Sequence, residues 1–270
     1  MLPYLNMNHL EDAPADIIKK AREGRQVSIR TLSDALGITP KEAQEQEEGH
    51  KLFSQNLVEA LGLSFERLNK IAELKYMPEP AQETIGELKL KTFQVEVGGI
   101  VSNAYILTHG HYALLVDSIG ASPEAAVYLK EQGARPIYLL ITHGHFDHIA
   151  GIGVITDAYP EIRVIYAAKD IHGDRMEFEC TGFRIEVIRT PGHTEDAVCY
   201  FINNAIAFVG DTIFAGSIGR PNYSYEKLLE NIRTQIFEWP DKVILCPGHG
   251  PTTTVGEEKR NNPFFKSNNL

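Results

Sequence analysis

Short apolar runs and glycine-containing turns alternate along the chain from about residue 88 onward. Short runs rich in branched and aromatic residues between such turns are typical of β-strands, whereas longer stretches are typical of helices. We expect helices at residues 123–132 and 225–237. This order of strands and then a helix, twice over, fits an α/β (α+β) structure with helices covering the sheets. We expect strands at residues 93–97, 104–107, 113–117, 137–141, 164–167, 183–188, 198–202, 205–209 and 243–246.

The first part of the chain has a helical pattern instead. Residues 17–22 form an amphipathic segment, and residues 31–40 predict a helix, a glycine turn and the capped start of a second helix. The sequence Pro78-Glu79-Pro80 marks the join to the strand-rich part. A chain of 270 residues has room for two domains, and we place a small all-α domain at residues 1–80 and a larger domain at residues 88–270.

The composition fits a folded chain, since 43% of the residues are hydrophobic. No run approaches the ~20 apolar residues of a membrane span. The first residues lack the basic and apolar regions of a secretory signal, so we expect a cytoplasmic protein. Cys180, Cys199 and Cys246 form no Cys-x-x-Cys pair, which predicts reduced thiols without a catalytic role.

Half of the ten histidines lie in glycine-containing turns that follow strand-like runs. Loops at the ends of buried strands commonly carry function. Imidazole and carboxylate groups are the ligands that zinc, iron and manganese accept. Two histidines separated by one residue on a turn can point at one metal while the next Asp-His pair points at its neighbour. The candidate metal ligands are His143, His145, Asp147 and His148 in Thr142-His143-Gly144-His145-Phe146-Asp147-His148, then His193, Asp211 and His249.

With these motifs, the chain from about residue 88 onward resembles the metallo-β-lactamase superfamily. Residues 210–220 resemble the signature of its glyoxalase II group, and Asp211 in place of a cysteine argues against the antibiotic-hydrolysing branch. The resemblance implies a four-layer αββα sandwich with the metals at one edge. It also implies a hydrolase that acts on a thioester, in the manner of a hydroxyacylglutathione hydrolase.

The resemblance assigns the candidate ligands to two divalent metal ions. His143, His145 and His193 would bind one metal, and a second set, Asp147, His148 and His249, would bind the other. Asp211 would bridge them, so that Asp147 and Asp211 are the catalytic carboxylates. A water shared by the two cations would lose a proton near neutral pH and attack the substrate carbonyl as hydroxide. Asp117 would accept a hydrogen bond from one of the ligating histidines.

Some positions depart from the glyoxalase II pattern. Gly250-Pro251-Thr252 replaces a tyrosine-bearing turn, and Pro221-Asn222 replaces an expected aromatic residue. Arg220 is then the obvious candidate on that loop for binding an anionic part of the substrate. Glu195 and Asp196 place negative charge beside the expected cleft, which disfavours a strongly anionic substrate there. His109-Gly110-His111 repeats the His-x-His spacing without the Asp-His extension, and we interpret it as a hairpin turn.

Residues 15–74 resemble the phage-repressor-like helix-turn-helix domains. The segment in the recognition-helix position, residues 40–49, holds Lys41 against four glutamates, and residues 1–87 carry a formal charge of −5, from ten Lys+Arg and fifteen Asp+Glu. Binding to nucleic acid requires cations that neutralise phosphates. We therefore favour a module that forms a homodimer or covers the metal cleft over one that reads DNA.

The sequence pattern also fits two other functions. Persulfide dioxygenases keep similar motifs but bind one iron through two histidines and an aspartate. A DNA-linked regulator would use the metal domain to sense a metabolite, and would show salt-sensitive DNA binding.

Overall fold

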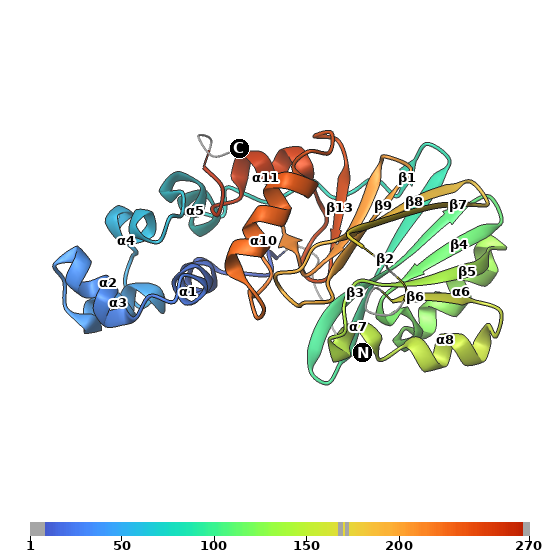
Figure 1. Cartoon of the computed structure of the whole chain (residues 1–270), viewed down its shortest axis with the longest axis horizontal. Helices are drawn as coiled ribbons and strands as arrows, with labels where there is room; N and C mark the ends of the chain where they lie inside the picture. The colour runs from blue at the N-terminus through green and yellow to red at the C-terminus, as the bar shows by residue number, and fades with distance from the viewer. Residues whose placement is uncertain (1–8, 167–169, 171–172, 267–270) are drawn as a thin grey trace.

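The computed structural model describes residues 9–166, 170 and 173–266. Helices α1 to α5 occupy one end of the molecule, two β-sheets occupy the other, and helices α10 and α11 lie between them (Figure 1). No described helix is both long enough and apolar enough to cross a membrane.

Each of the two main sheets has six strands. Parallel pairing joins β4 to β5, β5 to β6 and β10 to β13, and the other neighbours are antiparallel. The first sheet runs β1 (Thr84–Ile85), β2 (Leu88–Val97), β3 (Ile100–His109), β4 (Tyr112–Val116), β5 (Arg135–Ile141) and β6 (Arg163–Tyr166). The second runs β14 (Thr253–Thr254), β13 (Ile244–Pro247), β10 (Ile206–Gly210), β9 (Val198–Ile202), β8 (Phe183–Arg189) and β7 (Arg175–Cys180).

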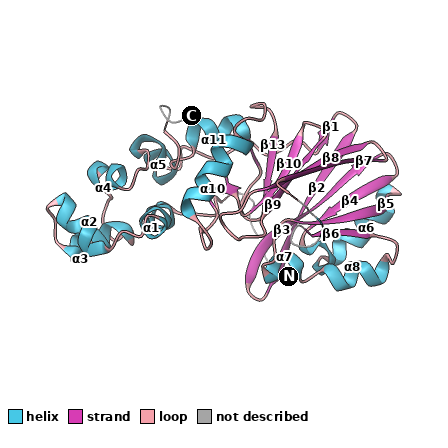
Figure 2. Cartoon of the chain, viewed as in Figure 1, coloured by secondary structure: helices cyan, strands magenta, loops and turns pink. Residues whose placement is uncertain are grey.

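The sheets pack face to face because alternate side chains of a strand point to opposite faces. On β4, Leu114 and Val116 enter the core between the sheets, whereas Leu115 enters the core on the outer face. Helices α6 (Pro123–Gln132) and α8 (Ile152–Ala158) cover that outer face, and α10 (Tyr225–Asn231) and α11 (Val255–Asn261) cover the other sheet (Figure 2). The expected αββα sandwich is confirmed.

The described residues before β1 form five short helices. Serine or threonine caps the first turns of α2 to α5, and Gly37 ends α2 at φ +66°. The expected helix, glycine turn and capped helix over residues 31–40 are therefore present. The helices are α1 (Pro14–Gly24), α2 (Ile29–Leu36), α3 (Pro40–Glu47), α4 (Gln55–Ala60) and α5 (Phe65–Ala72).

One hydrophobic core joins these helices to the sandwich. Ile17 and Leu68 of the helical part belong to the same buried cluster as Leu228 and Phe265. Burial of these side chains on both sides of the contact stabilises the two parts together. The division between residues 1–80 and 88–270 stays a prediction.

The apolar runs did not reveal every element. Strand β7 lies at a sheet edge, where Arg175, Glu177 and Glu179 point to solvent and interrupt the apolar run. The expected helix over residues 225–237 is α-helical only to Asn231 and then continues as a π-helical turn, Ile232–Ile236. The strand expected at residues 164–167 ends at Tyr166, and Ala167 lies outside the described residues.

Candidate metal centre

The candidate metal ligands lie where strands of both sheets end. His143 and His145 follow β5, and the short helix α7 (Phe146–Ile149) then presents Asp147 and His148. The other three ligands follow β8, β10 and β13, and the parallel pairing of β10 with β13 brings the turns after these two strands to the same edge. These three are His193, Asp211 and His249.

The seven side chains form two groups of donor atoms, within each of which all atoms lie within 4.8 Å of one another. In the first group, His145 Nδ1 lies 2.9 Å from His193 Nε2 and 3.1 Å from His143 Nε2. In the second group, Asp147 Oδ2 lies 3.3 Å from His148 Nε2 and 3.4 Å from His249 Nε2. The first group also contains Asp211.

Asp211 faces both groups. Its Oδ2 lies 3.3 Å from His193 Nε2 and 3.5 Å from His249 Nε2, while its Oδ1 lies 3.5 Å from His148 Nε2. The carboxylate is therefore placed where one residue can contribute to two cation sites.

A pair of orphaned polar atoms tests whether this arrangement suits metal ions. His148 Nε2 and Asp211 Oδ1 are buried and have no hydrogen-bond partner in the described structure. Buried polar atoms normally find partners because leaving them unpaired is costly. A cation between these atoms would satisfy both, and the mixture of imidazole and carboxylate donors suits zinc, iron or manganese. The residues present fit divalent metals.

The Nδ1 atoms of three of these histidines are held by hydrogen bonds. His193 Nδ1 donates to the carbonyl of Arg220 at 2.6 Å, and His249 Nδ1 donates to the carbonyl of Val101 at 2.8 Å. His148 Nδ1 donates to Asp117 at 2.9 Å, as the resemblance implies. A proton on Nδ1 leaves the Nε2 lone pair directed into the centre, which is the form of histidine that binds a metal.

Burial and the local charges shift the pKa values of the ligands in different directions. Burial lowers the pKa of His143 and of His193, which favours the neutral form. For His148, the effect of burial is outweighed by Asp117 and Asp147, and the pKa rises to about 10. For His249, Asp147 and Asp211 outweigh burial and raise the pKa to about 11. When no cation is bound, the protonated rings of His148 and His249 therefore offset the negative charge of Asp147 and Asp211.

Glycine leaves the space that this geometry needs. A Cβ atom on Gly248 would lie 2.2 Å from Asp211 Oδ1 and 2.7 Å from a ring carbon of His148. A Cβ atom on Gly219 would lie 1.7 Å from the carbonyl oxygen of Asp211. The glycines next to the ligands therefore permit close packing of the turns.

Other residues that the sequence singled out lie around or away from the centre. Arg220 is exposed at the end of its loop, and its backbone carbonyl is what holds His193. Asp196 accepts a hydrogen bond from the Tyr166 hydroxyl at 2.9 Å, beside the turn of Gly144. His109 lies at the β3–β4 hairpin and contacts Glu87 at 2.9 Å, so the interpretation as a hairpin residue is confirmed.

The loop of residues 211–220, here the Asp211 loop, is anchored by residues that sequence reasoning missed. Lys20 Nζ of α1 donates to the carbonyl of Ile218 at 2.8 Å, and the Ser217 hydroxyl donates to Asp12 at 2.5 Å. The backbone N–H of Gly216 donates to the buried carboxylate of Glu258 at 2.9 Å. The helical part and α11 thus hold the loop that carries Asp211.

The N-terminal segment also reaches a ligand turn. A Cβ atom on Gly250, next to His249, would lie 3.1 Å from the backbone nitrogen of Glu11. The chain just before α1 therefore packs against the His249 turn and borders the metal centre.

Comparison with known proteins agrees with this fold. The family model of the metallo-β-lactamase superfamily matches residues 97–179. The chain is 29% identical to "Probable metallo-hydrolase YqgX" of Bacillus subtilis, over 67% of this chain and 100% of that protein. It is 29% identical to "Hydroxyacylglutathione hydrolase GloC" of Haemophilus influenzae, over 57% of this chain and 88% of that protein.

Two solved structures are also similar to this chain in fold. The BLEG-1 B3 metallo-β-lactamase is 29% identical, with a TM-score of 0.58 over 64% of this chain and 99% of its own. TTHA1623 in a di-iron-bound form is 27% identical, with a TM-score of 0.54 over 64% of this chain and 100% of its own. Over the matched residues the chain is similar to the metallo-β-lactamase superfamily and to proteins described as metallo-hydrolases, and its two donor groups are candidate sites for divalent metals.

Proposed function

We propose that the protein is a binuclear metal-dependent hydrolase that acts on a thioester, in the manner of a hydroxyacylglutathione hydrolase. The observation that carries the proposal is the position of Asp211 between two groups of donor atoms. His143, His145 and His193 would hold one metal. Asp147, His148 and His249 would hold the other, and Asp211 would contact both.

The chain's own residues would prepare the site in two ways. Hydrogen bonds from Nδ1 of His148, His193 and His249 fix the rings so that their other nitrogens face the centre. Asp147 and Asp211, whose pKa values the neighbouring histidines hold low in spite of burial, stay ionised and can accept hydrogen bonds from water. Divalent metals, when bound, polarise a carbonyl and make a water acidic enough to supply hydroxide near neutral pH.

The thioester is proposed from the glyoxalase II-like motif and from relatives such as GloC. The exposed Arg220 is the candidate for binding an anionic part of the substrate. Asp196, beside the turn of Gly144, and Glu11, beside Gly250, add negative charge around the site. If S-lactoylglutathione proves inactive, we therefore propose a different thioester. That substrate would carry less negative charge near the metals than glutathione thioesters do.

The helical part is proposed to support the metal site instead of reading DNA. The segment before α1 packs against the His249 turn, and α1 holds the Asp211 loop. On α3, Lys41 is already paired with Glu45, which lies 3.8 Å away. We expect no salt-sensitive DNA binding in a gel-shift assay, and clear binding would favour the regulator instead.

The first test is the metal content of protein purified without added metal, together with hydrolysis of S-lactoylglutathione by the same sample. About two metals per chain with turnover is the expected result. One iron per chain, with oxygen consumed in the presence of a thiol persulfide, would indicate a persulfide dioxygenase. Two metals per chain without turnover would support the binuclear centre but show that S-lactoylglutathione is not the substrate.

A further inference from the structure

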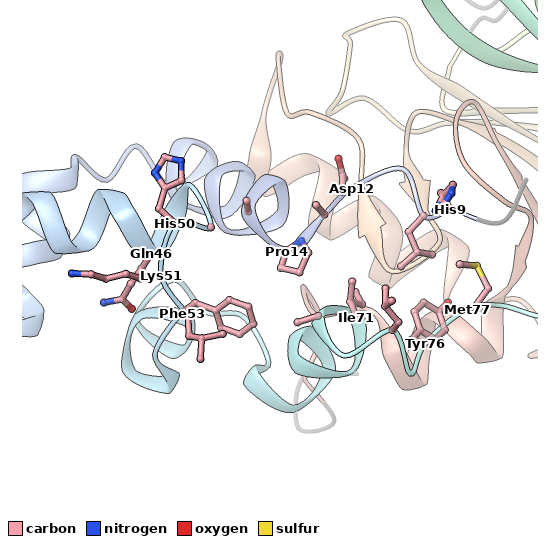
Figure 3. A pocket seen from close by; sticks show the side chains of 17 residues that line it. His9, Asp12, Pro14, Gln46, His50, Lys51, Phe53, Ile71, Tyr76 and Met77 are labelled. Atoms are coloured by element: carbon pink, nitrogen blue, oxygen red, sulfur yellow. The ribbon is translucent and has the colours of Figure 1, made fainter. Parts of the chain in front are cut away.

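A pocket of about 800 Å³ lies in the helical part, and all the residues that line it fall within residues 9–77. Its walls come from the segment before α1, from the connection between α3 and α4, and from the end of α5 with the residues that follow it. Figure 3 shows Phe53, Ile71 and Tyr76 along one side and Pro14 and Asp12 along the other. Small-molecule sites in proteins commonly measure ~300–1,000 Å³.

Large apolar side chains gather at this pocket although they are open to solvent. Leu52 is 95% exposed, Leu74 is 90% exposed and Met77 is 46% exposed, and all three line it. Single exposed apolar residues are ordinary, but a cluster of them around a concavity is typical of a binding site.

The charged side chains of the wall already have partners. Lys51 lies 2.7 Å from Glu45, and Asp12 lies 2.5 Å from Lys20. A charged ligand would have to compete with these pairs, whereas an uncharged apolar ligand would not. The chemistry of the wall therefore favours a neutral, mostly apolar small molecule.

The same wall holds the Asp211 loop. Asp12 accepts the hydroxyl of Ser217, and the Tyr76 hydroxyl donates at 2.7 Å to Glu258, which accepts the N–H of Gly216. A Cβ atom on Gly216 would lie 3.0 Å from both Ile71 and Tyr76, so the loop packs directly on the wall. A ligand that moves Tyr76 would move the loop.

We propose that this pocket binds a small, uncharged, mostly apolar molecule, and that its binding changes the affinity of the metal centre for its cations. The coupling would pass from Tyr76 in the pocket wall, through its hydrogen bond to Glu258, to the Asp211 loop. The binding site stands on the pocket alone, whereas the coupling rests on the proposed metal centre. By linkage, the cation must change the affinity for the apolar ligand by the same factor.

The site is tested by titrating the metal-free protein with Nile red, a neutral apolar dye, and following its fluorescence. We expect saturable binding of one dye per chain. Leu52→Asp and Leu74→Asp should each weaken it about tenfold or more, because a charge enters the apolar mouth. Val127→Asp is the matched control, since Val127 is 57% exposed on α6 and does not line this pocket, and it should leave the affinity unchanged. Equal effects of all three variants, or no effect of the first two, would reject the site.

The coupling is tested by repeating the titration on protein loaded with zinc alone. We expect the dye dissociation constant to change about fivefold or more, and the zinc dissociation constant to change by the same factor with dye present. Tyr76→Phe keeps the ring but removes the hydroxyl that contacts Glu258, so dye binding should remain while the coupling is lost. Equal dye affinities with and without zinc would reject the coupling. A wild-type protein that neither binds zinc nor hydrolyses the thioester would contradict the proposed function. Dye binding to the metal-free chain would still test the pocket by itself.

Discussion

At the scale of single residues, Asp211 has the most demanding position. Its two oxygens face histidines of both donor groups, and one oxygen has no hydrogen-bond partner in the described structure. We expect Asp211→Ala to lower the metal content from about two to one or none per chain and to reduce turnover by about 100-fold or more. Metal analysis and an activity assay on the same sample measure both effects.

His109→Ala is the control for that experiment, because this His-x-His copy lies at the β3–β4 hairpin. It should leave the metal content and turnover unchanged. An Asp211→Ala protein with full metal and full activity would show that the ligand assignment is wrong.

Asp117 acts on a ligand without joining the donor groups. It is buried and accepts hydrogen bonds from His148 Nδ1 and from the backbone N–H of Thr142. Asp117→Asn should lower metal affinity about 10–100-fold, because the amide no longer fixes the tautomer of His148. Competition with a chelator measures the change. Unaltered affinity would mean that Asp117 serves only the packing of its turn.

Glu258 gives a pH prediction. Burial raises the pKa of this carboxyl to about 7, although Tyr76, Thr253, Asn262 and Gly216 donate hydrogen bonds to it. Between about pH 4.5, the pKa of the unfolded chain, and about pH 7, Glu258 therefore keeps its proton in the native state and has lost it in the unfolded state. This contribution to stability is complete below about pH 4.5 and is lost as the pH rises through 7.

The Glu258→Gln variant isolates that effect, because a glutamine does not titrate. Between pH 5 and pH 8, the free energy of unfolding of the metal-free variant should gain about 2 kcal/mol relative to the wild type. Urea unfolding at both pH values measures it. A constant difference between the two proteins would show that Glu258 has no raised pKa.

At the scale of elements, the Asp211 loop depends on a helix almost two hundred residues away in the sequence. Lys20 of α1 bonds both the loop carbonyl of Ile218 and the carboxylate of Asp12. We expect Lys20→Met to weaken metal binding about tenfold or more, because the loop that carries Asp211 loses its anchor. Ser217→Ala, which removes a single hydrogen bond from the same loop, should give a smaller loss.

Arg22 supplies the matched control, since it lies on the same helix but pairs with Glu47 inside the helical part. Arg22→Met should lower stability and leave metal affinity unchanged. Metal affinities that fall equally in the Lys20 and Arg22 variants would show a general loss of stability and no role in positioning.

At the scale of the whole molecule, the shared core predicts cooperative unfolding. Leu68 of α5 is fully buried in the same cluster as Trp239, the single tryptophan, which stacks on Phe201 of β9. Tryptophan fluorescence should therefore report the sandwich side of the core, while circular dichroism also follows α1 to α5. The two urea transitions should coincide, and Leu68→Ala should shift both by about 2–5 kcal/mol. Two separate transitions would indicate independent domains.

Local sequence patterns predict many of the elements and the candidate ligands of this protein. His143 to His148 lie within six residues, and the ligand turns after β8, β10 and β13 each follow a recognisable apolar strand. Helix α6 and the capped turn between α2 and α3 have the expected positions because caps, glycine and apolar spacing act over a few residues. The edge strand β7 has no continuous apolar run, although its alternation of polar and apolar residues from Arg175 to Cys180 is the period-two pattern of a half-buried strand.

The candidate donor residues could be predicted from the sequence, because the His-x-His-x-Asp-His spacing is a local property of the chain, and the layered fold followed from the family resemblance that these motifs carry. The contacts that hold the Asp211 loop, in contrast, join segments far apart in the sequence. Lys20 meets Ile218 across 198 positions, and Tyr76 meets Glu258 across 182. Neither Lys20 on the amphipathic helix α1 nor Tyr76 after α5 has a local sequence signature of such a contact. Their partners, and the pocket beside them, exist because burial of the shared core brings distant segments together.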